Sequence, residues 1–519
     1  MADKEYKDIP KEMFEFANVG EKLSDKKFDT KPIGYFKDAW LRFRKNRASV
    51  LASIIILIII LYALLVPLFS IGKDTQLMDT YYAKKGPRIT WLRQFGIADG
   101  GVEREFSEKA IVNAIGIGVA AADVDGKGGV SLSEGLENEY QPIIKINGES
   151  TEIGKTIYHA KTDAYLEVGF KYRDIEQSEY AKIVEWEKET GLKVLYPLIE
   201  KNEYNHDSAN ANYWYKTDSG NAVRINASGQ AVRIPYSEDM VLEDNYKRDE
   251  NGNAVYYEYV GGGTIETAQY RVRVLYYNYY RYVNGHEPNY IMGTDSQGYD
   301  LAYRIANGIQ LSLMIAVFVS VINFIIGAIY GAIEGYYGGA VDLTMERIAD
   351  ILAGVPFIVV ATLFQIHLSM KVGAIPSLLF AFVMTGWIST AANVRMQFYR
   401  FKNQEYVMAA RTLGASDARI IWKHIFPNSL GTIITSSVLV IPNVIFSESM
   451  LSFLGIVNLG GSERTSLGTL LSDASEIWTN YPHLMLFPAI VISLLMICFN
   501  LFGNGLRDAF NPSLRGVED

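Results

Sequence analysis

Residues 405–428 read EYVMAARTLGASDARIIWKHIFPN, a charged stretch between two apolar runs that are each long enough to cross a membrane. The pattern of residues 403–413 predicts one helix, which Gly414 can end because glycine adopts the left-handed conformation without strain. A membrane protein gains nothing from such a segment unless it meets a partner or a surface. The stretch therefore decides what kind of membrane protein this is.

The remainder of the stretch predicts a second short helix. Ser416 or Asp417 can cap its start, and Pro427 is expected to stop it because proline has no backbone N–H to donate. Ala409 and Ala410 give the first helix a flat face with charges on either side. Two short helices at an angle suit docking into a groove on a soluble partner; the alternative is an amphipathic linker on the membrane surface.

Residues 48–70 are uncharged and apolar over a length that crosses a bilayer of about 30 Å. The span follows a charged leader and lacks a small-residue cleavage site, so it is not a cleaved signal peptide. Five further spans are expected near residues 308–333, 348–368, 372–392, 430–455 and 484–502. The expected fold is an α-helical polytopic membrane protein with six transmembrane helices and an inserted α+β domain.

The distribution of basic residues orients the chain. Lysine and arginine crowd the N-terminal edge of the first span and recur in residues 393–429, and such segments stay in the cytoplasm. Six spans also return the chain to the side on which it started. We therefore expect both termini in the cytoplasm, residues 71–300 on the outer face of the cell membrane, and residues 1–36 lying on the membrane or on a partner.

The segment between the first two spans, residues 71–300, is polar and holds 36 acidic and 25 basic side chains, so the chain's net charge of −9 resides there. The single cysteine, Cys498, lies in the last span, so this segment has no disulfide. Its many tyrosines suit strand packing or contact with a ligand or protein. We expect strands in residues 270–283, helices in 102–120 and 175–190, and a hairpin at 220–236.

The segment NGESTEIGKT, residues 147–156, invites a phosphate-loop interpretation. It places five residues between Gly148 and Gly154, however, where that motif requires four. Its two glutamates would also repel phosphate. Elsewhere the six histidines are scattered, and the sequence holds no nucleophile elbow, zinc signature or basic nucleic-acid patch. We expect neither catalysis nor nucleic-acid binding in this chain.

The segment DVDGKGGVSLSE, residues 123–134, matches a calcium-binding loop in part. Lys127 stands at the fifth position, where such a loop requires an oxygen ligand, and calcium loops usually occur in pairs. A calcium site and an ordinary acidic turn both stay open. The candidate ligands are Asp123, Asp125, Ser131 and Glu134.

Charged residues within spans suggest function by default, because burying a charge in lipid is costly. Glu448 lies in the fifth span and is expected either to face a water-filled translocation passage or to reach the outer interface. Arg347 is expected to pair with a neighbouring carboxylate at the membrane edge. Pro356 should kink its span, and Gly331 and Gly335 suit close helix packing.

With these residues in view, the opening stretch resembles the EAA-type coupling loop of bacterial ABC importer permeases. Their pattern is EAA, three residues, glycine and a hydrophobic-proline end; it is matched by Ala409, Ala410, Gly414 and Pro427, with Met408 in place of the usual glutamate. Four other segments are similar, in order and spacing, to the dipeptide/oligopeptide/nickel permease group: residues 293–313, 335–356, 447–456 and 499–516.

The resemblance covers roughly residues 30–70 and 290–516, and the leader and closing segment are similar to those of the C-type subunit. Tyr299 departs from the family, which usually has arginine there, and Ala392 stands where an Ala-Arg pair is common. The large departure is the segment between the first two spans, which is short in most C-type members. The resemblance says nothing about the role of that segment.

The resemblance implies an ATP-driven importer of oligopeptides or dipeptides. This chain would form half of the passage with a homologous permease subunit, two ATPase subunits would bind ATP-Mg, and an extracytoplasmic binding protein would deliver peptide. This chain would have no ATPase site or cofactor of its own. The residues implied in coupling are Glu405, Ala409, Ala410, Arg411, Gly414, Asp417 and Pro427. The alternatives are a permease for nickel or another small solute, or a membrane-anchored extracellular receptor.

These expectations divide the chain into five parts. They are a cytoplasmic tail (1–47), a first transmembrane helix (48–70), an extracytoplasmic inserted domain (71–300), a five-helix permease core (301–507) with coupling helices at 405–428, and a cytoplasmic tail (508–519).

Overall fold

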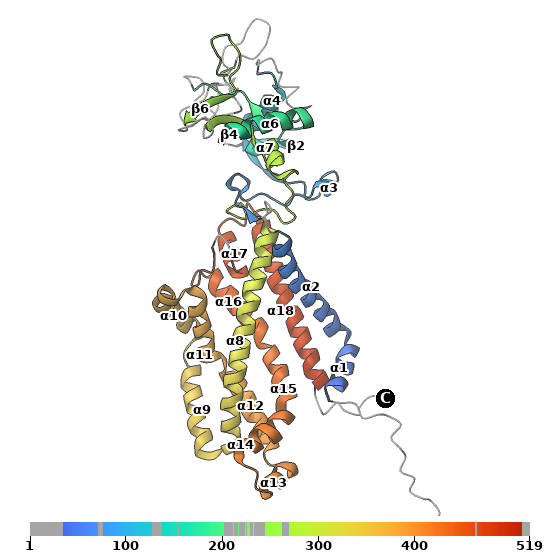
Figure 1. Cartoon of the computed structure of the whole chain (residues 1–519), viewed down its shortest axis with the longest axis vertical. Coiled ribbons are helices and arrows are strands. Elements are labelled where there is room, and N and C mark those ends of the chain that lie inside the picture. Colours follow the sequence, from blue (N-terminus) through green and yellow to red (C-terminus); the bar gives the residue numbers. More distant parts are fainter. Residues whose placement is uncertain are drawn as a thin grey trace, which may run out of the picture.

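The computed structural model describes residues 35–70, 76–126, 137–152, 155–201, 244–261, 269–461 and 464–510, with a few isolated residues between 211 and 232. It is a long bundle of helices that carries a mixed α/β insertion at one end (Figure 1). Both connections to the insertion leave the bundle at that end, from α2 and into α8. We call it the insertion end of the bundle.

Within the described residues, five helical segments are long and apolar enough to cross a membrane. They are α2 (Arg47–Phe69), α8 (Leu301–Tyr337), Ala374–Phe401, Asp417–Phe453 and α18 (Pro482–Phe510). The third comprises α11 (Ala374–Gly386) and α12 (Ile388–Phe401), and the fourth includes α15 (Phe426–Val438) and α16 (Val440–Phe453). The short helices α1 (Tyr35–Lys45) and α17 (Leu467–Ala474) pack beside them.

The span expected at residues 348–368 is broken. α9 (Gly339–Ala353) and α10 (Phe357–Val372) meet at an angle of 70°, so they make a sixth span only if the bent pair counts as one. Pro356 stands at the N-cap of α10, and the residue before a proline avoids the helical region, so α9 cannot continue. The expected kink at Pro356 is therefore confirmed, and the expected span is divided between α9 and α10.

α8 and α12 pack backbone to backbone. A Cβ atom on Gly331 would collide with the carbonyl group of Ala391, and one on Gly335 would lie 2.8 Å from the carbonyl oxygen of Arg395. Small residues let membrane helices approach this closely, which increases their dispersion contacts. The expected role of both glycines is confirmed.

The described part of the insertion contains two antiparallel sheets. In the first, β3 (Lys155–Asp163) lies between β1 (Gly101–Ser107) and β2 (Ile143–Glu152). In the second, β7 (Gln269–Leu275) pairs along its length with β4 (Phe170–Glu176), while β5 (Leu195–Tyr196) and β6 (Tyr257–Gly261) share its other edge. The helices are α3 (Thr90–Arg93), α4 (Glu108–Ala122), α6 (Gln177–Thr190) and α7 (Tyr276–Asn284).

Several local predictions for the insertion change. Residues 102–107 form β1 and helix α4 begins only at Glu108, because the Ser107 hydroxyl accepts a hydrogen bond from the amide of Ala110 and caps the helix there. The tyrosine-rich run expected as one strand ends as β7 at Leu275 and continues as α7. Residues 147–152 end β2 and residues 155–156 begin β3, and these two strands pair with each other. Most of the hairpin expected at 220–236 lies outside the described residues.

The core of the insertion encloses a charge. Arg88 is fully buried and donates to both carboxylate oxygens of Asp163 at 3.0 and 3.1 Å and to the Tyr277 hydroxyl at 2.8 Å. Its guanidinium also lies 5.0 Å from the ring centre of Tyr165. The interaction joins the segment after α2 to the first sheet and to α7, so one side chain holds three parts of the insertion together.

We predict that Arg88→Ala loosens the insertion by about 3 kcal/mol, since it leaves the buried Asp163 carboxylate without its main partner. Amide hydrogen exchange of the full chain should then accelerate in β3 and α7. Arg271→Ala is the matched control, because Arg271 pairs with Asp174 in water and an exposed pair is worth about 1 kcal/mol at most. Equal protection in the two variants would contradict the prediction.

Candidate functional site

The 405–428 element begins with α13 (Glu405–Thr412) and turns at Gly414. Gly414 has a φ of +81°, its amide donates to the Arg411 carbonyl at 3.0 Å, and the next amide donates to the Ala410 carbonyl at 3.0 Å. This is a glycine-terminated helix end. The turn predicted from the sequence is confirmed.

The second helix of the element does not stop at Pro427. It starts with α14 (Asp417–Arg419), widens into a π-helical turn η7 (Ile420–Ile425) and continues as α15. In the π-turn the amide of Phe426 donates five residues back, to the Ile421 carbonyl. Pro427 then falls in the first turn of α15, where its missing N–H is not needed. The expected stop is wrong for this reason.

The cap expected at the start of this helix is present only in the backbone. Ser416 occupies the N-cap position with extended backbone angles, but its hydroxyl makes no capping hydrogen bond. The Asp417 carboxylate instead accepts a hydrogen bond from the Tyr336 hydroxyl at 2.5 Å, and Arg411 donates to the same hydroxyl at 3.3 Å. Tyr336 belongs to α8, so it ties both halves of the element to that helix.

Apolar contacts fix the inner face of the element. Val407, Ile420 and Ile425 are completely buried, in a cluster with Phe398 of α12 and residues of α8. Burying a side chain of this size contributes roughly 1.5–3 kcal/mol. The element is therefore held by the same two helices that pack against each other through glycine.

The outer face of the element is open. Leu413 is 88% exposed, and Met408, Trp422 and Ala409 are also exposed, whereas Ala410 is half-buried. Glu405 and Arg411 lie at the two ends of α13 and are exposed as well. Figure 1 shows α13 at the end of the bundle opposite the insertion. The element presents an apolar surface with charges beside it that this chain leaves uncovered.

A second charged site lies beside the element, between α8, α9 and α12. Arg395 donates to both carboxylate oxygens of Asp342 at 2.6 and 3.0 Å and to both of Glu346 at 2.8 Å. The buried Glu334 lies 3.5 Å away. The three carboxylates are close enough together to hold a metal ion. Because the Arg395 guanidinium already bridges the three carboxylates, the site suits this arginine better than a metal ion.

The GTDSQGYD loop (residues 293–300) forms a clamp at the insertion end. Thr294 and Asp295 pair through their backbones with Lys85 and Lys84, and a Cβ atom on Gly298, at φ +94°, would collide with the Asp79 carbonyl. The loop is thereby locked onto the segment that follows α2.

Arg304, in the first turns of α8, attaches the clamp to that helix. It lies 3.2 Å from the Asp295 carboxylate, donates to the Gly461 carbonyl at 2.9 Å and lies 4.9 Å from the ring centre of Tyr299. Burial raises the pKa of Asp295, although Arg304 opposes that shift. Tyr299, which departs from the family pattern, thus stacks on a buried arginine.

Glu448 takes neither of the positions considered from the sequence. It is fully buried, with Ser312 of α8 donating to it at 2.8 Å and Ser452 at 3.1 Å. Serine hydroxyls on neighbouring helix turns satisfy the carboxylate inside the bundle, so in this chain it faces neither a passage nor the interface. Glu448 acts as a polar packing contact between α8 and α16.

Only two of the four candidate calcium ligands lie within the described residues. Asp123 is buried and accepts a hydrogen bond from the Tyr246 hydroxyl at 2.9 Å, while Asp125 is exposed. Ser131 and Glu134 lie outside the described residues. The calcium site stays a prediction, with one of its candidate ligands already engaged.

Comparison with known proteins identifies the class of this chain. Residues 327–516 match the model for the binding-protein-dependent transport system inner membrane component, and residues 34–87 match the N-terminal TM domain of oligopeptide transport permease C. The oligopeptide transport system permease protein OppC of Bacillus subtilis is 40% identical over 224 residues, 43% of this chain and 72% of the relative. The chain belongs to this permease family.

A second curated relative agrees in class. The Escherichia coli K12 protein OppC is 42% identical to this permease over 231 residues, 44% of this chain and 74% of that protein. A solved structure of the methionine ABC transporter MetNI, in inward-facing conformations, aligns with 40% of this chain and 97% of its own at 15% identity, with a TM-score of 0.34, too low to support further argument. The protein is a multi-pass membrane permease subunit with the ABC importer permease fold, which works in a membrane complex.

Sequence reasoning missed the ion pairs of Arg304 and Arg395. It expected Arg347 to pair with a neighbouring carboxylate, which proves to be Asp350 at 3.2 Å, but it did not expect the partners of Arg395. Asp342 and Glu346 are four residues apart and so share one face of α9, which was the available signal. The π-turn had no comparable signal, because nothing in its sequence forces a five-residue hydrogen bond.

We predict that Arg395→Gln destabilises the permease by about 2 kcal/mol, because three carboxylates then face one another. Thermal unfolding of the purified protein should show a lower midpoint, and Arg395→Lys should be intermediate, because lysine keeps the charge but loses the planar fork. Adding Asp342→Asn to Arg395→Gln should recover part of the loss. Arg347→Gln, in an exposed pair, is the control and should change little.

Proposed function

We propose that this permease imports oligopeptides or dipeptides by alternating access. It forms half of the passage with a second, homologous permease subunit; two ATPase subunits bind ATP-Mg, and an extracytoplasmic binding protein delivers the peptide. The peptide permeases among its relatives favour this substrate over nickel or another small solute. The absence of a phosphate loop at residues 147–156 agrees with ATP hydrolysis on partner chains.

The 405–428 element carries the proposal. It is anchored on one face by buried residues and by Tyr336, and it is open on the other face. A segment of this kind suits docking into a groove on an ATPase subunit and moving with it as a rigid body. Closure of the ATPases would then tilt α8 and α12 together, as packed elements switch between discrete arrangements. The proposed coupling residues lie on this element.

The proposed orientation places the insertion outside the cell and the 405–428 element in the cytoplasm. Arg42, Arg44 and Lys45 in the last turn of α1 support it, because basic residues beside a span remain inside. Figure 1 shows α1 and α13 both in the half of the molecule away from the insertion. The cytoplasmic location of both termini follows from the same orientation.

Gly414→Val is expected to uncouple transport. A β-branched residue at φ +81° costs about 1–2 kcal/mol and would shift the turn between α13 and α14. Peptide uptake should fall about tenfold or more while ATP hydrolysis by the complex loses its response to loaded binding protein. Gly414→Asn is the control, because asparagine tolerates this conformation and should retain near-normal uptake. Normal uptake in Gly414→Val at equal expression would refute the coupling role.

We propose further that the insertion docks or supplements the binding protein at the mouth of the passage. The clamp supports this, because it ties residues 79–85 and 293–300 rigidly to the first turns of α8. A ligand-bearing protein seated on the insertion would therefore be held in register with the bundle. The acidic, tyrosine-rich composition of the insertion suits such contact.

Deletion of the insertion can be designed without breaking the clamp. Arg88 and Tyr290 pair as antiparallel neighbours, so Ile89 and Asn289 can be joined by a two-residue Asn-Gly turn that replaces residues 90–288. We expect peptide uptake to show a several-fold higher half-saturating concentration of binding protein, with the maximal rate less affected. Unchanged uptake kinetics across peptide lengths would contradict the docking role.

A further inference from the structure

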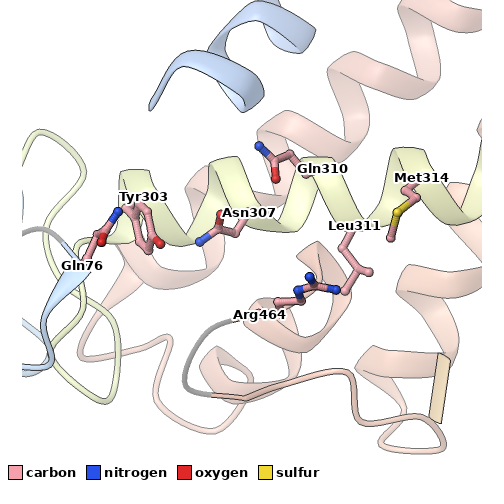
Figure 2. Close-up of a pocket in the computed structure, with 7 residues that line it drawn as sticks. All are labelled: Gln76, Tyr303, Asn307, Gln310, Leu311, Met314 and Arg464. Carbon is pink, nitrogen blue, oxygen red and sulfur yellow. The ribbon is translucent and has the colours of Figure 1, made fainter. Parts of the chain in front are cut away.

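A polar cavity opens at the insertion end of α8. It has a volume of about 490 Å³, within the range typical of small-ligand pockets. Figure 2 shows α8 along one side of it and Arg464 on the other. The lining residues are Gln76, Tyr303, Asn307, Gln310, Leu311, Met314 and Arg464.

The charge of this cavity is one-sided. Among the described residues that line it, Arg464 is the one cation and none is a carboxylate. Within the described part of the chain, no ion pair or hydrogen bond engages the exposed Arg464 guanidinium. Arg304 provides the contrast, because it lies near the same end of α8 but is buried and paired with Asp295. The cavity therefore holds a positive charge that the described chain does not neutralise.

Described residues on both sides of Arg464 are held in place. The Gly461 carbonyl on one side accepts a hydrogen bond from Arg304, and on the other side Thr465 and Ser466 are completely buried. The Ser466 hydroxyl caps α17 by accepting from the amide of Thr469 at 3.1 Å. Arg464 therefore projects from a fixed base, which lowers the entropy lost on binding.

Other polar groups line the cavity together with Arg464. The side-chain nitrogen Nδ2 of Asn307 is buried and has no hydrogen-bond acceptor among the described residues, a condition that costs free energy unless a ligand or water supplies one. Gln310 donates through Nε2 to the Ala63 carbonyl, which fixes its orientation and leaves its oxygen as an acceptor. Tyr303 adds a hydroxyl one turn before Asn307.

Beyond this polar end the cavity becomes apolar. Leu311 and Met314 line its far side, and Val317, Phe318 and Val321 continue along α8 as exposed side chains. Methionine adapts to side chains of different shape. A ligand with an anionic end and an apolar part of variable shape would match the polar and apolar ends of this cavity.

We propose that the cavity binds the C-terminal carboxylate of a peptide as it enters the passage. Arg464 pairs with the carboxylate through two parallel N–H···O bonds, and Asn307 donates its free N–H to the same group. Leu311 and Met314 then contact the last side chain of the peptide. The inference rests on the proposed import of peptides and adds the group by which this chain recognises them.

The test compares uptake of trialanine with that of its C-terminal amide, which lacks the charge. Cells that lack the native chain are supplied with the wild type or with Arg464→Gln at equal membrane levels. The ratio of acid to amide uptake should fall about tenfold in Arg464→Gln, the value of a charge-assisted hydrogen-bonded contact. Any preference contributed by the binding protein is common to both strains, so it cancels in the comparison of the two ratios.

Three further variants sharpen the result. Lys371→Gln removes an exposed charge from the last turn of α10 and should leave the ratio unchanged. Arg464→Lys keeps the charge without the fork and should give an intermediate ratio. Asn307→Asp places a negative charge in the cavity and should lower the ratio as Arg464→Gln does; these last two carry the test if Arg464→Gln fails to reach the membrane.

The outcomes separate this inference from the proposed function. If the wild type imports trialanine but the cavity variants change acid and amide uptake equally, or not at all, the carboxylate site is overturned and peptide import stands. An equal loss of uptake of the acid and the amide is also the result expected if Arg464 binds a lipid phosphate, and it too overturns the carboxylate site. If the wild type imports neither peptide, the proposed function fails and the carboxylate site fails with it.

Discussion

One uninterrupted helix determines how the rest of this permease is arranged. α8 runs from Leu301 to Tyr337, a length of roughly 55 Å at 1.5 Å per residue. Its first turns hold the clamp through Arg304, its middle packs against α12 through glycine, and its last turn holds the 405–428 element through Tyr336. A displacement at either end of this helix must therefore reach the other, unless the helix bends.

Two buried arginines and one half-buried arginine show how the chain uses charge inside the fold. Arg88, Arg304 and Arg395 each join segments that are distant in sequence, and each reaches carboxylates or carbonyls that no apolar side chain could select. Buried ion pairs contribute little net stability because desolvation offsets their attraction, but breaking one is costly. Their contribution here is to the register of the insertion, of the clamp and of α9. Apolar packing alone would not fix the register of these three parts, because it is not directional.

The sequence was most informative where local chemistry decides structure. Gly414 had to end a helix, Pro356 had to break one, and the uncharged apolar runs had to cross a membrane, because in each case the alternative conformation is costly. Prediction failed where tertiary contacts decide. Pro427 is accommodated by a π-turn, residues 276–284 form a helix because their tyrosines pack into the insertion core, and Glu448 is buried because serines from α8 and α16 surround it. Hydropathy cannot foresee a partner that is distant in sequence.

Each end of the bundle presents groups that the described chain leaves uncovered or without a partner. At one end Leu413, Met408 and Trp422 are exposed on an element whose other face is rigidly anchored. At the other end Arg464 and Asn307 line a cavity beside the clamp, and the buried side-chain nitrogen of Asn307 has no acceptor among the described residues. Exposed apolar surface and an unsatisfied buried donor both cost free energy, which a partner or ligand that covers or binds them can recover. In the proposed importer, an ATPase groove covers the first set and a peptide carboxylate meets the second, and α8 connects the two.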